Sequence, residues 1–175
     1  TKEVSSALYV GIMTDTGSFR HPRTGSDVFM VCADLINDGA DPVKLYEEIY
    51  GNTTKENLLL MARFISGLEF YSGNKVVLGT VTQKDFKTFG LDIDHVEGFT
   101  SLIMNIKGIK LGIILVELKD NIKISFRSKG NIPVNKLAAE FNGGGHKNAA
   151  GANVKGSSIP ELKEQILKKT ENYID

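Results

Sequence analysis

Apolar residues recur every three or four positions in the first part of the chain, which is the period of an α-helix. Breaks made of glycine, proline, threonine and asparagine separate these stretches. The pattern predicts four helices, over residues 4–13, 27–37 and 41–51 and from Thr53 to about Leu68. Thr53 and Glu56 have the spacing of a capping box, and we expect the fourth helix to connect two halves of the chain.

After a break at Ser72-Gly73-Asn74, the pattern changes to short runs rich in valine and isoleucine, which are typical of strands. It predicts strands over residues 75–82, 110–118, 122–127 and 152–154, and helices over 83–89, 92–107, 134–141 and 159–174. The expected fold class is therefore α/β, with a mixed sheet in the second half. We predict three parts: residues 1–52, a linker helix over 53–72, and a compact domain over 73–175.

Composition limits the function classes. Hydrophobic residues make up 41% and charged residues 24%, as in a globular protein, and 21 basic residues balance 21 acidic ones. Without a net charge, any recognition of phosphate must come from a local patch, which argues against a binder of long duplexes. Cys32 is the single cysteine, so no intrachain disulfide can form, which fits a reducing cytoplasm. Its apolar neighbours predict that Cys32 is buried. The longest apolar run, Leu111–Val116, is too short to span a membrane.

Three consecutive glycines followed by a histidine stand out at Gly143–His146. Glycine lets the backbone adopt positive φ and approach a ligand closely, and backbone N–H groups in such a loop can bind phosphate. The residues alone equally fit a flexible turn between a helix and a strand.

Two further positions could carry chemistry. Asp15 lies between threonines at a helix–loop junction, where its carboxylate suits a hard divalent metal; the alternative is an ordinary turn aspartate. Arg127 lies at the end of a strand, opposite in orientation to Phe126, where its guanidinium can bind phosphate with Ser128 as an added donor. The alternative for Arg127 is a solvated charge at the end of a strand.

The segment Asp92-Ile93-Asp94-His95 places three possible metal ligands close together. It also has the composition of a helix start, where acidic residues complement the helix dipole. We interpret it as a helix cap.

With these residues in view, the sequence resembles the DHH-family phosphoesterases. Gly143–Gly151 resembles the Gly-Gly-Gly-His signature of the domain that follows the DHH domain, and Ala7–Phe19 resembles the last motif of the DHH domain itself. The two motifs occur in the family's order, well over a hundred residues apart. The similarity is greatest to the nanoRNase and pAp-phosphatase subgroup, often described as exopolyphosphatase-related.

The sequence also departs from the family pattern. A complete member begins with a domain that carries an Asp-x-Asp motif, a further aspartate and an Asp-His-His triplet. That domain's motifs are missing here, and Asp92-Ile93-Asp94-His95 lies in the wrong domain to replace them. The resemblance therefore implies that residues 1–52 are the C-terminal part of a DHH catalytic domain and residues 73–175 the DHH-associated substrate-binding domain. Among the metal ligands only Asp15 is matched, so we expect no complete catalytic set here and no catalysis by this chain alone.

For the intact protein, the resemblance implies a Mn²⁺-dependent hydrolase with a two-metal site. The substrate would be a short oligoribonucleotide (nanoRNA) or a nucleoside bisphosphate such as pAp, in the cytoplasm and without a membrane; a homodimer is left open. Arg127 and Ser128 would bind a phosphate, and His146 would donate to it beside the Gly144 and Gly145 amides.

Two alternatives remain at this point. A cyclic-dinucleotide or polyphosphate phosphohydrolase would share the metal chemistry and differ only in substrate. A non-catalytic nucleic-acid-binding module would resemble the Gly-rich domain of alanyl-tRNA synthetases, which handles tRNA; the Asp15 motif argues against it.

Overall fold

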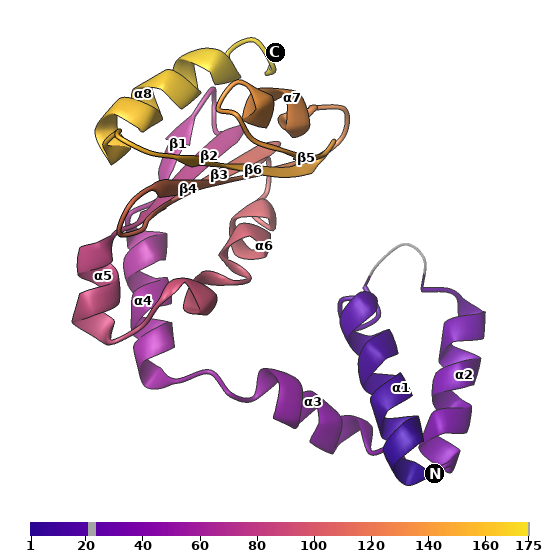
Figure 1. The fold of residues 1–175 in the computed structure, drawn as a ribbon. Coiled ribbons are helices and arrows are strands. Elements are labelled where there is room, and N and C mark those ends of the chain that lie inside the picture. Colours follow the sequence, from indigo (N-terminus) through magenta and orange to yellow (C-terminus); the bar gives the residue numbers. More distant parts are fainter. Residues whose placement is uncertain (21–23, 175) are drawn as a thin grey trace. The chain divides into compact units, whose positions relative to one another are not determined.

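The structure of the protein is a computed structural model that describes residues 1–20 and 24–174. The chain divides into two compact units, Thr1–Thr54 and Lys55–Asp175 (Figure 1). In the part of the chain that the structure describes, no helix is long and apolar enough to cross a membrane.

The first unit is helical, as the apolar period predicts. Its helices are α1 (Lys2–Asp15), α2 (Ser26–Asn37) and α3 (Pro42–Tyr50). Asp41 caps α3 by accepting hydrogen bonds from the Val43 and Lys44 amides, both at 3.1 Å. Cys32 is buried, as expected, in a small core with Tyr9, Met13, Leu35 and Ala40.

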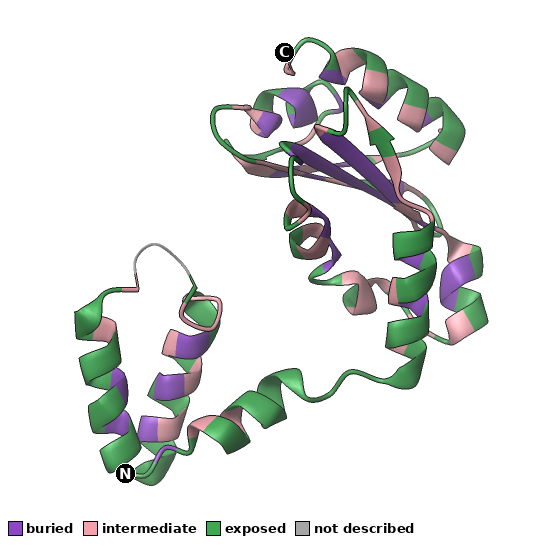
Figure 2. Ribbon diagram, turned by 180° about the vertical axis from the view of Figure 1, so that it is seen from behind, coloured by how far each residue is buried: buried purple, intermediate pink, exposed green. Residues whose placement is uncertain are grey.

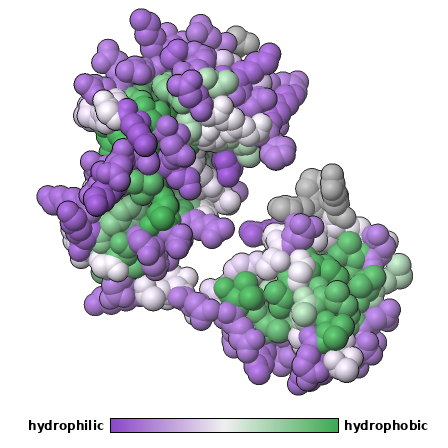
Figure 3. Space-filling view, in the orientation of Figure 1, coloured by the Kyte–Doolittle hydropathy of each residue, from purple (hydrophilic) through white to green (hydrophobic). Residues whose placement is uncertain are grey.

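Much of the apolar surface of this unit stays exposed. Figure 3 shows apolar side chains gathered over its surface. The large hydrophobic residues that are more than two-fifths exposed are Val4, Leu8, Phe29, Met30, Val31, Ile36, Val43, Tyr46, Ile49 and Tyr50. Within this unit, the three helices thus bury only some of their apolar side chains and leave the others exposed.

A left-handed turn follows α1, in the loop that the sequence predicts. Gly17, Ser18 and Phe19 have φ values of 56°, 58° and 65°, a region that a bulky residue such as phenylalanine rarely adopts. The Phe19 ring stacks on Phe29 with 5.4 Å between centroids and meets Tyr9 edge-on at 6.1 Å. This aromatic packing holds the turn next to Asp15.

The second unit is built on a mixed sheet with the order β1-β2-β3-β4-β6-β5. Its strands are β1 (Glu69–Tyr71), β2 (Val76–Val81), β3 (Leu111–Glu117), β4 (Ile122–Ser128), β5 (Gly144–His146) and β6 (Ala149–Val154). The pair β2–β3 is parallel and the other pairs are antiparallel. The α/β class with a mixed sheet is therefore confirmed.

Helices cover the two faces of this sheet unequally. The helical segments of the unit are α4 (Lys55–Ser66), α5 (Gln83–Phe89), the 3₁₀ turn η1 (Ile93–Val96), α6 (Phe99–Met104), α7 (Val134–Ala139) and α8 (Ile159–Thr170). α7 and α8 pack on one face over the core that contains Phe126 and Leu137. α4, α5 and α6 pack on the other face, over β2 and β3 (Figure 1).

This unequal cover explains the two kinds of strand sequence. β3 is buried on both faces and is apolar throughout except at its last residue, Glu117. β4 alternates between buried and more exposed positions, because only its α7/α8 side is covered along its whole length. Figure 2 shows the buried strands at the centre of the unit. The sheet from β4 to β5 therefore keeps one face accessible.

α4 belongs to the second unit by its packing. Leu60 and Phe64 are buried on the sheet, and Phe64 lies so close to Gly79 of β2 that a Cβ there would overlap its ring. Arg63 of α4 also pairs with Asp85 of α5, with 3.2 Å between Nε and Oδ1. The role of residues 53–72 as a linker stays a prediction.

Two sequence predictions are wrong in detail. Residues 92–107 do not form one helix, because Gly98, with φ of 87°, separates η1 from α6. The glycine stretch is not a loop that ends a helix: Gly144–His146 is an edge strand that pairs with β6. Ser72–Asn74 is the tight turn between β1 and β2, and β1 was not predicted because three residues carry almost no periodic signal.

Candidate phosphate-binding site

The accessible face of β4 carries a line of polar side chains. Ile122, Ile124 and Phe126 point into the α7/α8 core, so the alternating residues Lys123 and Arg127 point to the opposite face. Ser125 lies between them on the same face. The predicted orientation of Arg127 opposite Phe126 is confirmed.

The glycine stretch forms a β5–β6 hairpin whose glycines have different surroundings. A Cβ on Gly143 would collide with the Gly151 carbonyl and the Ala152 side chain. Gly145 has φ of 143°, and a Cβ there would lie 2.6 Å from the Ala149 carbonyl oxygen. A Cβ on Gly144 would meet nothing within 4 Å. Gly143 and Gly145 thus permit the hairpin itself, whereas Gly144 faces open space.

Strand register brings Arg127 and His146 into one row. Arg127 pairs with Ala149 of β6, and Ala149 pairs with His146 of β5. Directly opposed residues of antiparallel strands project to the same face, and two strand spacings amount to about 9–10 Å. The two side chains that the sequence analysis named separately therefore flank a single alanine methyl group.

A shallow cavity of about 400 Å³ lies along this part of the sheet. Its lining includes Arg127, Ser125, Gly144, Ala149 and Gly151. The small residues of β5 and β6 form a floor without bulky side chains, so the sheet surface is hollow beside Arg127. Gly145 and His146 are not part of this lining, although His146 is exposed at the end of the row.

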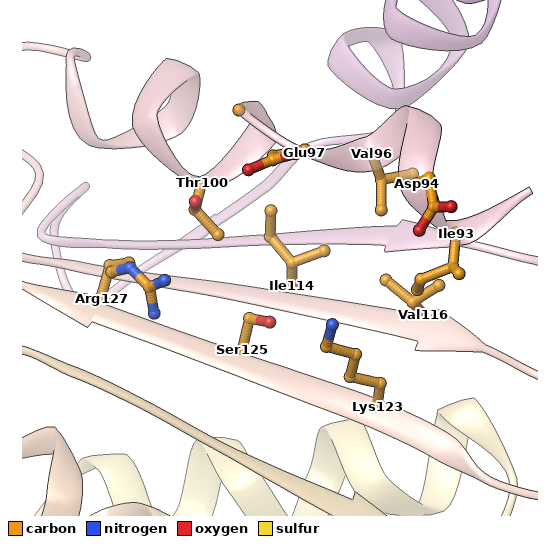
Figure 4. Close-up of a pocket in the computed structure, with 11 residues that line it drawn as sticks. Ile93, Asp94, Val96, Glu97, Thr100, Ile114, Val116, Lys123, Ser125 and Arg127 are labelled. Atoms are coloured by element: carbon orange, nitrogen blue, oxygen red, sulfur yellow. The ribbon is translucent and has the colours of Figure 1, made fainter. Parts of the chain in front are cut away.

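Arg127 is oriented by its own strand. One of its terminal nitrogens, Nη1, donates a hydrogen bond to the Phe126 carbonyl oxygen at 3.0 Å. Within residues 1–20 and 24–174, no carboxylate forms an ion pair with Arg127. The remaining N–H groups of the guanidinium can therefore bind an anionic ligand. Arg127 also lines a second cavity on the same face, towards η1 (Figure 4).

Ser128 lies apart from this row. Its hydroxyl group donates to the Ile132 carbonyl oxygen at 2.7 Å and accepts from Asn148 Nδ2 at 2.9 Å. Both bonds tie the end of β4 to the neighbouring loops. The role of Ser128 as a phosphate donor stays a prediction.

Asp15 lies in the first unit, exposed at the end of α1. Together with Asp27 it lines a small cavity between α1 and α2. The hydroxyl groups of Thr14 and Thr16 donate to backbone carbonyls of α1, at 2.9 Å to Val10 and 2.7 Å to Ile12. Among the residues that the structure describes, no group of three or more histidine, cysteine or acidic side chains is arranged to hold a metal.

The segment after Asp92 is a cap, as predicted. Asp92 Oδ1 accepts from the Asp94 amide at 3.1 Å and lies 2.8 Å from His95 Nδ1. The hydrogen bond with His95 is the main cause that lowers the pKa of Asp92, with the Asp94 amide second. Asp92 and His95 therefore stabilise the start of η1.

Sequence reasoning did not identify Lys123, Ser125 and Ala149 as parts of this surface. The signal for the first two was present, because Ile122–Ser128 alternates apolar and polar residues. No signal marked Ala149, since its position beside Arg127 depends on the pairing of β4 with β6.

Comparisons with known proteins agree with this architecture. Residues 73–175 match the family model of the DHHA1 domain. The chain is 29% identical over 167 residues to the bifunctional oligoribonuclease and PAP phosphatase NrnA of Thermus thermophilus, covering 95% of this chain and 50% of the relative. It is 28% identical to the cyclic-di-AMP phosphodiesterase PdeA of Listeria monocytogenes, covering 97% of this chain and 25% of that protein.

A solved structure is also similar. The crystal structure of an exopolyphosphatase-related protein from Bacteroides fragilis superposes with a TM-score of 0.88 at 33% identity, covering 98% of this chain and 52% of that one. The chain thus spans about half the length of the NrnA relative and of this structure.

Proposed function

Because the chain belongs to the DHHA1 domain family, we propose that its second unit binds the substrate of a phosphoesterase that hydrolyses short oligoribonucleotides, pAp or both. The oligoribonuclease and PAP phosphatase named among the relatives supports this substrate class. The observation that carries the proposal is the row of Arg127, Ala149 and His146 on the open face of the sheet.

The row has the dimensions of a site for one phosphate group. Arg127 and His146 lie on strands about 9–10 Å apart, with Ala149 between them, and both side chains project to the same face of the sheet. A guanidinium binds two phosphate oxygens at once through its parallel N–H groups, and an imidazole N–H binds a third. The Gly144 and Gly145 amides lie on the same hairpin beside His146, where we propose that they add donors.

The described residues do not provide the ligands of a two-metal centre. A two-metal centre needs several carboxylate or imidazole ligands, and the described residues offer no such group. The residues present therefore do not fit a Mn²⁺ pair on their own. We expect the 175-residue chain with Mn²⁺ to release no phosphate from pAp, measured by phosphate detection; turnover would contradict this.

Binding of pAp to the full chain tests the proposal directly, by isothermal titration calorimetry. We expect Arg127→Ala to raise the Kd at least about tenfold, because a charge-assisted bidentate contact contributes about 1.5–3 kcal/mol. His146→Ala should raise the Kd by a smaller factor. Lys168→Ala removes an exposed positive charge on α8, on the far side of the sheet, and should leave the Kd unchanged.

The proposal fails if both Arg127→Ala and His146→Ala bind pAp as the unsubstituted chain does. The same titration with a short linear dinucleotide and with cyclic-di-AMP separates the substrate alternatives. The similarity to a cyclic-di-AMP phosphodiesterase makes the cyclic ligand the relevant competitor.

A further inference from the structure

A cavity of about 270 Å³ lies between β4 and the segment that runs from η1 into α6. We call it the η1 cavity, and the residues of its lining that matter here are Asp94, Glu97, Ile114, Val116, Lys123 and Arg127. It opens on the same sheet face as the phosphate-binding row, and Arg127 belongs to both. A ligand phosphate on Arg127 would therefore border the η1 cavity.

The two walls of the η1 cavity carry opposite charges. Figure 4 shows the carboxylates of Asp94 and Glu97 on the helical wall. Lys123 and Arg127 lie opposite, on β4. In residues 1–20 and 24–174, neither cation forms an ion pair with either carboxylate, so the charges face a space instead of neutralising each other. This space suits a ligand with an anionic group at one end and N–H donors at the other.

The floor between these walls is apolar. Ile114 and Val116 of β3 are buried, and Ile93 and Val96 of η1 are half-buried around the same cavity. Because Ile114 and Val116 are almost fully covered, the half-buried Ile93 and Val96 supply most of the apolar surface on which a flat ring would pack. The hydroxyl of Thr100 adds one polar group on the helical wall. A volume of about 270 Å³ holds one such ring system and is too small for two nucleotides.

We propose that the η1 cavity binds the base of a nucleotide whose phosphate lies on Arg127, and that Asp94 and Glu97 make it prefer guanine. One carboxylate accepts hydrogen bonds from both N1–H and the N2 amino group of guanine. Adenine and uracil place an acceptor beside their donor, which a carboxylate repels. The inference rests on the proposed function, because it requires the phosphate on Arg127.

Three ligands distinguish the contribution of the base to the affinity from that of the phosphate. Guanosine and inosine 5′-monophosphates differ only in the N2 amino group, and ribose 5-phosphate lacks a base. We expect the full chain to bind the guanine nucleotide about five- to tenfold more tightly than the inosine nucleotide, since two parallel hydrogen bonds discriminate at this level. The measurement is the Kd of each ligand, from NMR chemical-shift titrations.

Variants of Asp94 and Glu97 test whether these two carboxylates cause the preference for guanine. The double variant Asp94→Asn/Glu97→Gln should bring the ratio of the two nucleotide Kd values close to one and leave the ribose 5-phosphate Kd unchanged. Glu164→Gln, an exposed site on α8, is the matched control and should preserve the ratio. Arg127→Ala should weaken all three ligands by a similar factor.

The outcomes distinguish this inference from the proposed function. Equal affinity of the unsubstituted chain for both nucleotides, with Arg127-dependent binding of ribose 5-phosphate, overturns the inference and leaves the proposed function standing. A guanine preference that survives the double variant also overturns it. Binding of ribose 5-phosphate that does not depend on Arg127 removes the basis of both.

Discussion

Arg127 of β4 and His146 of β5 lie on either side of Ala149, on one row of the sheet. They lie 19 positions apart in the sequence (146 − 127), and the pairing of both strands with β6 brings them together. Because the residue between them is alanine, only a methyl group occupies the space in which a phosphate would lie. The small side chain of Ala149 is therefore as important for the proposed site as the side chains of Arg127 and His146.

Filling this space should weaken the binding of pAp. In Ala149→Leu, the larger side chain lies over the position of the phosphate, and we expect the Kd for pAp to rise at least about tenfold, as for loss of the Arg127 contact. Ala139→Leu, at an exposed position of α7, is the control and should bind normally. Calorimetric titration checks both, and unchanged affinity in Ala149→Leu would place the phosphate elsewhere.

The three consecutive glycines should respond differently to alanine. Gly143→Ala and Gly145→Ala force a Cβ against the backbone of β6, so we expect each to lower the free energy of unfolding by about 1–3 kcal/mol. Gly144→Ala meets open space and should leave stability unchanged or raise it by up to about 1 kcal/mol. Urea denaturation followed by circular dichroism measures all three. Equal effects at the three positions would show that the hairpin geometry is wrong.

Ser128 should matter for stability. Its hydroxyl satisfies the Ile132 carbonyl and the Asn148 side chain, so Ser128→Ala should cost about 1–3 kcal/mol through the unpaired groups it leaves. Ser125→Ala is the matched control, since no hydrogen bond of the Ser125 side chain occurs in the described part of the chain, and it should cost less than about 0.5 kcal/mol. Urea midpoints that rank the two variants the other way would contradict this assignment.

The ion pair between Glu69 of β1 and Lys163 of α8 should make the free energy of unfolding depend on pH. Lys163 Nζ contacts Glu69 Oε2, which also accepts from the Tyr71 hydroxyl at 2.8 Å. The hydrogen bond from Lys163 lowers the pKa of Glu69, and the same bond raises the pKa of Lys163. The contribution of Glu69 is therefore complete above the carboxyl's usual pKa and is lost as the pH falls through its lowered value. The contribution of Lys163 is lost only as the pH rises through its raised value.

Lys163→Met tests this dependence. At pH 7 the variant should be less stable by up to about 1 kcal/mol, a small effect because the Glu69 side chain is 42% exposed. The difference should shrink as the pH is lowered from 7 to about 3, because the Glu69 contribution declines once the pH is below a carboxyl's usual pKa. Urea denaturation at both pH values measures it, with Lys168→Met as the control. If the difference in the free energy of unfolding does not change with pH, the variant loses stability through packing and not through the ion pair.

Local sequence determined most of the helices and the long strands. The apolar period predicted α1 to α3, and the runs rich in valine and isoleucine predicted β3 and β4. Glycines with positive φ, by contrast, did not indicate the correct element. Gly98 broke a predicted helix, and Gly145 was assigned to a loop although it lies in a strand. Glycine signals an unusual backbone but does not specify which element contains it.

The sequence by itself determined which residue types were available for phosphate binding: an arginine at a strand end and a histidine after three glycines. Only the tertiary structure decided that Arg127 and His146 share a row, that Ala149 separates them, and that Ser128 is engaged elsewhere. The physical reason is that side-chain period is a local property, whereas the register between β4, β6 and β5 depends on hydrogen bonds between distant segments. The acidic wall opposite Arg127 likewise exists only because η1 folds over β3 and β4.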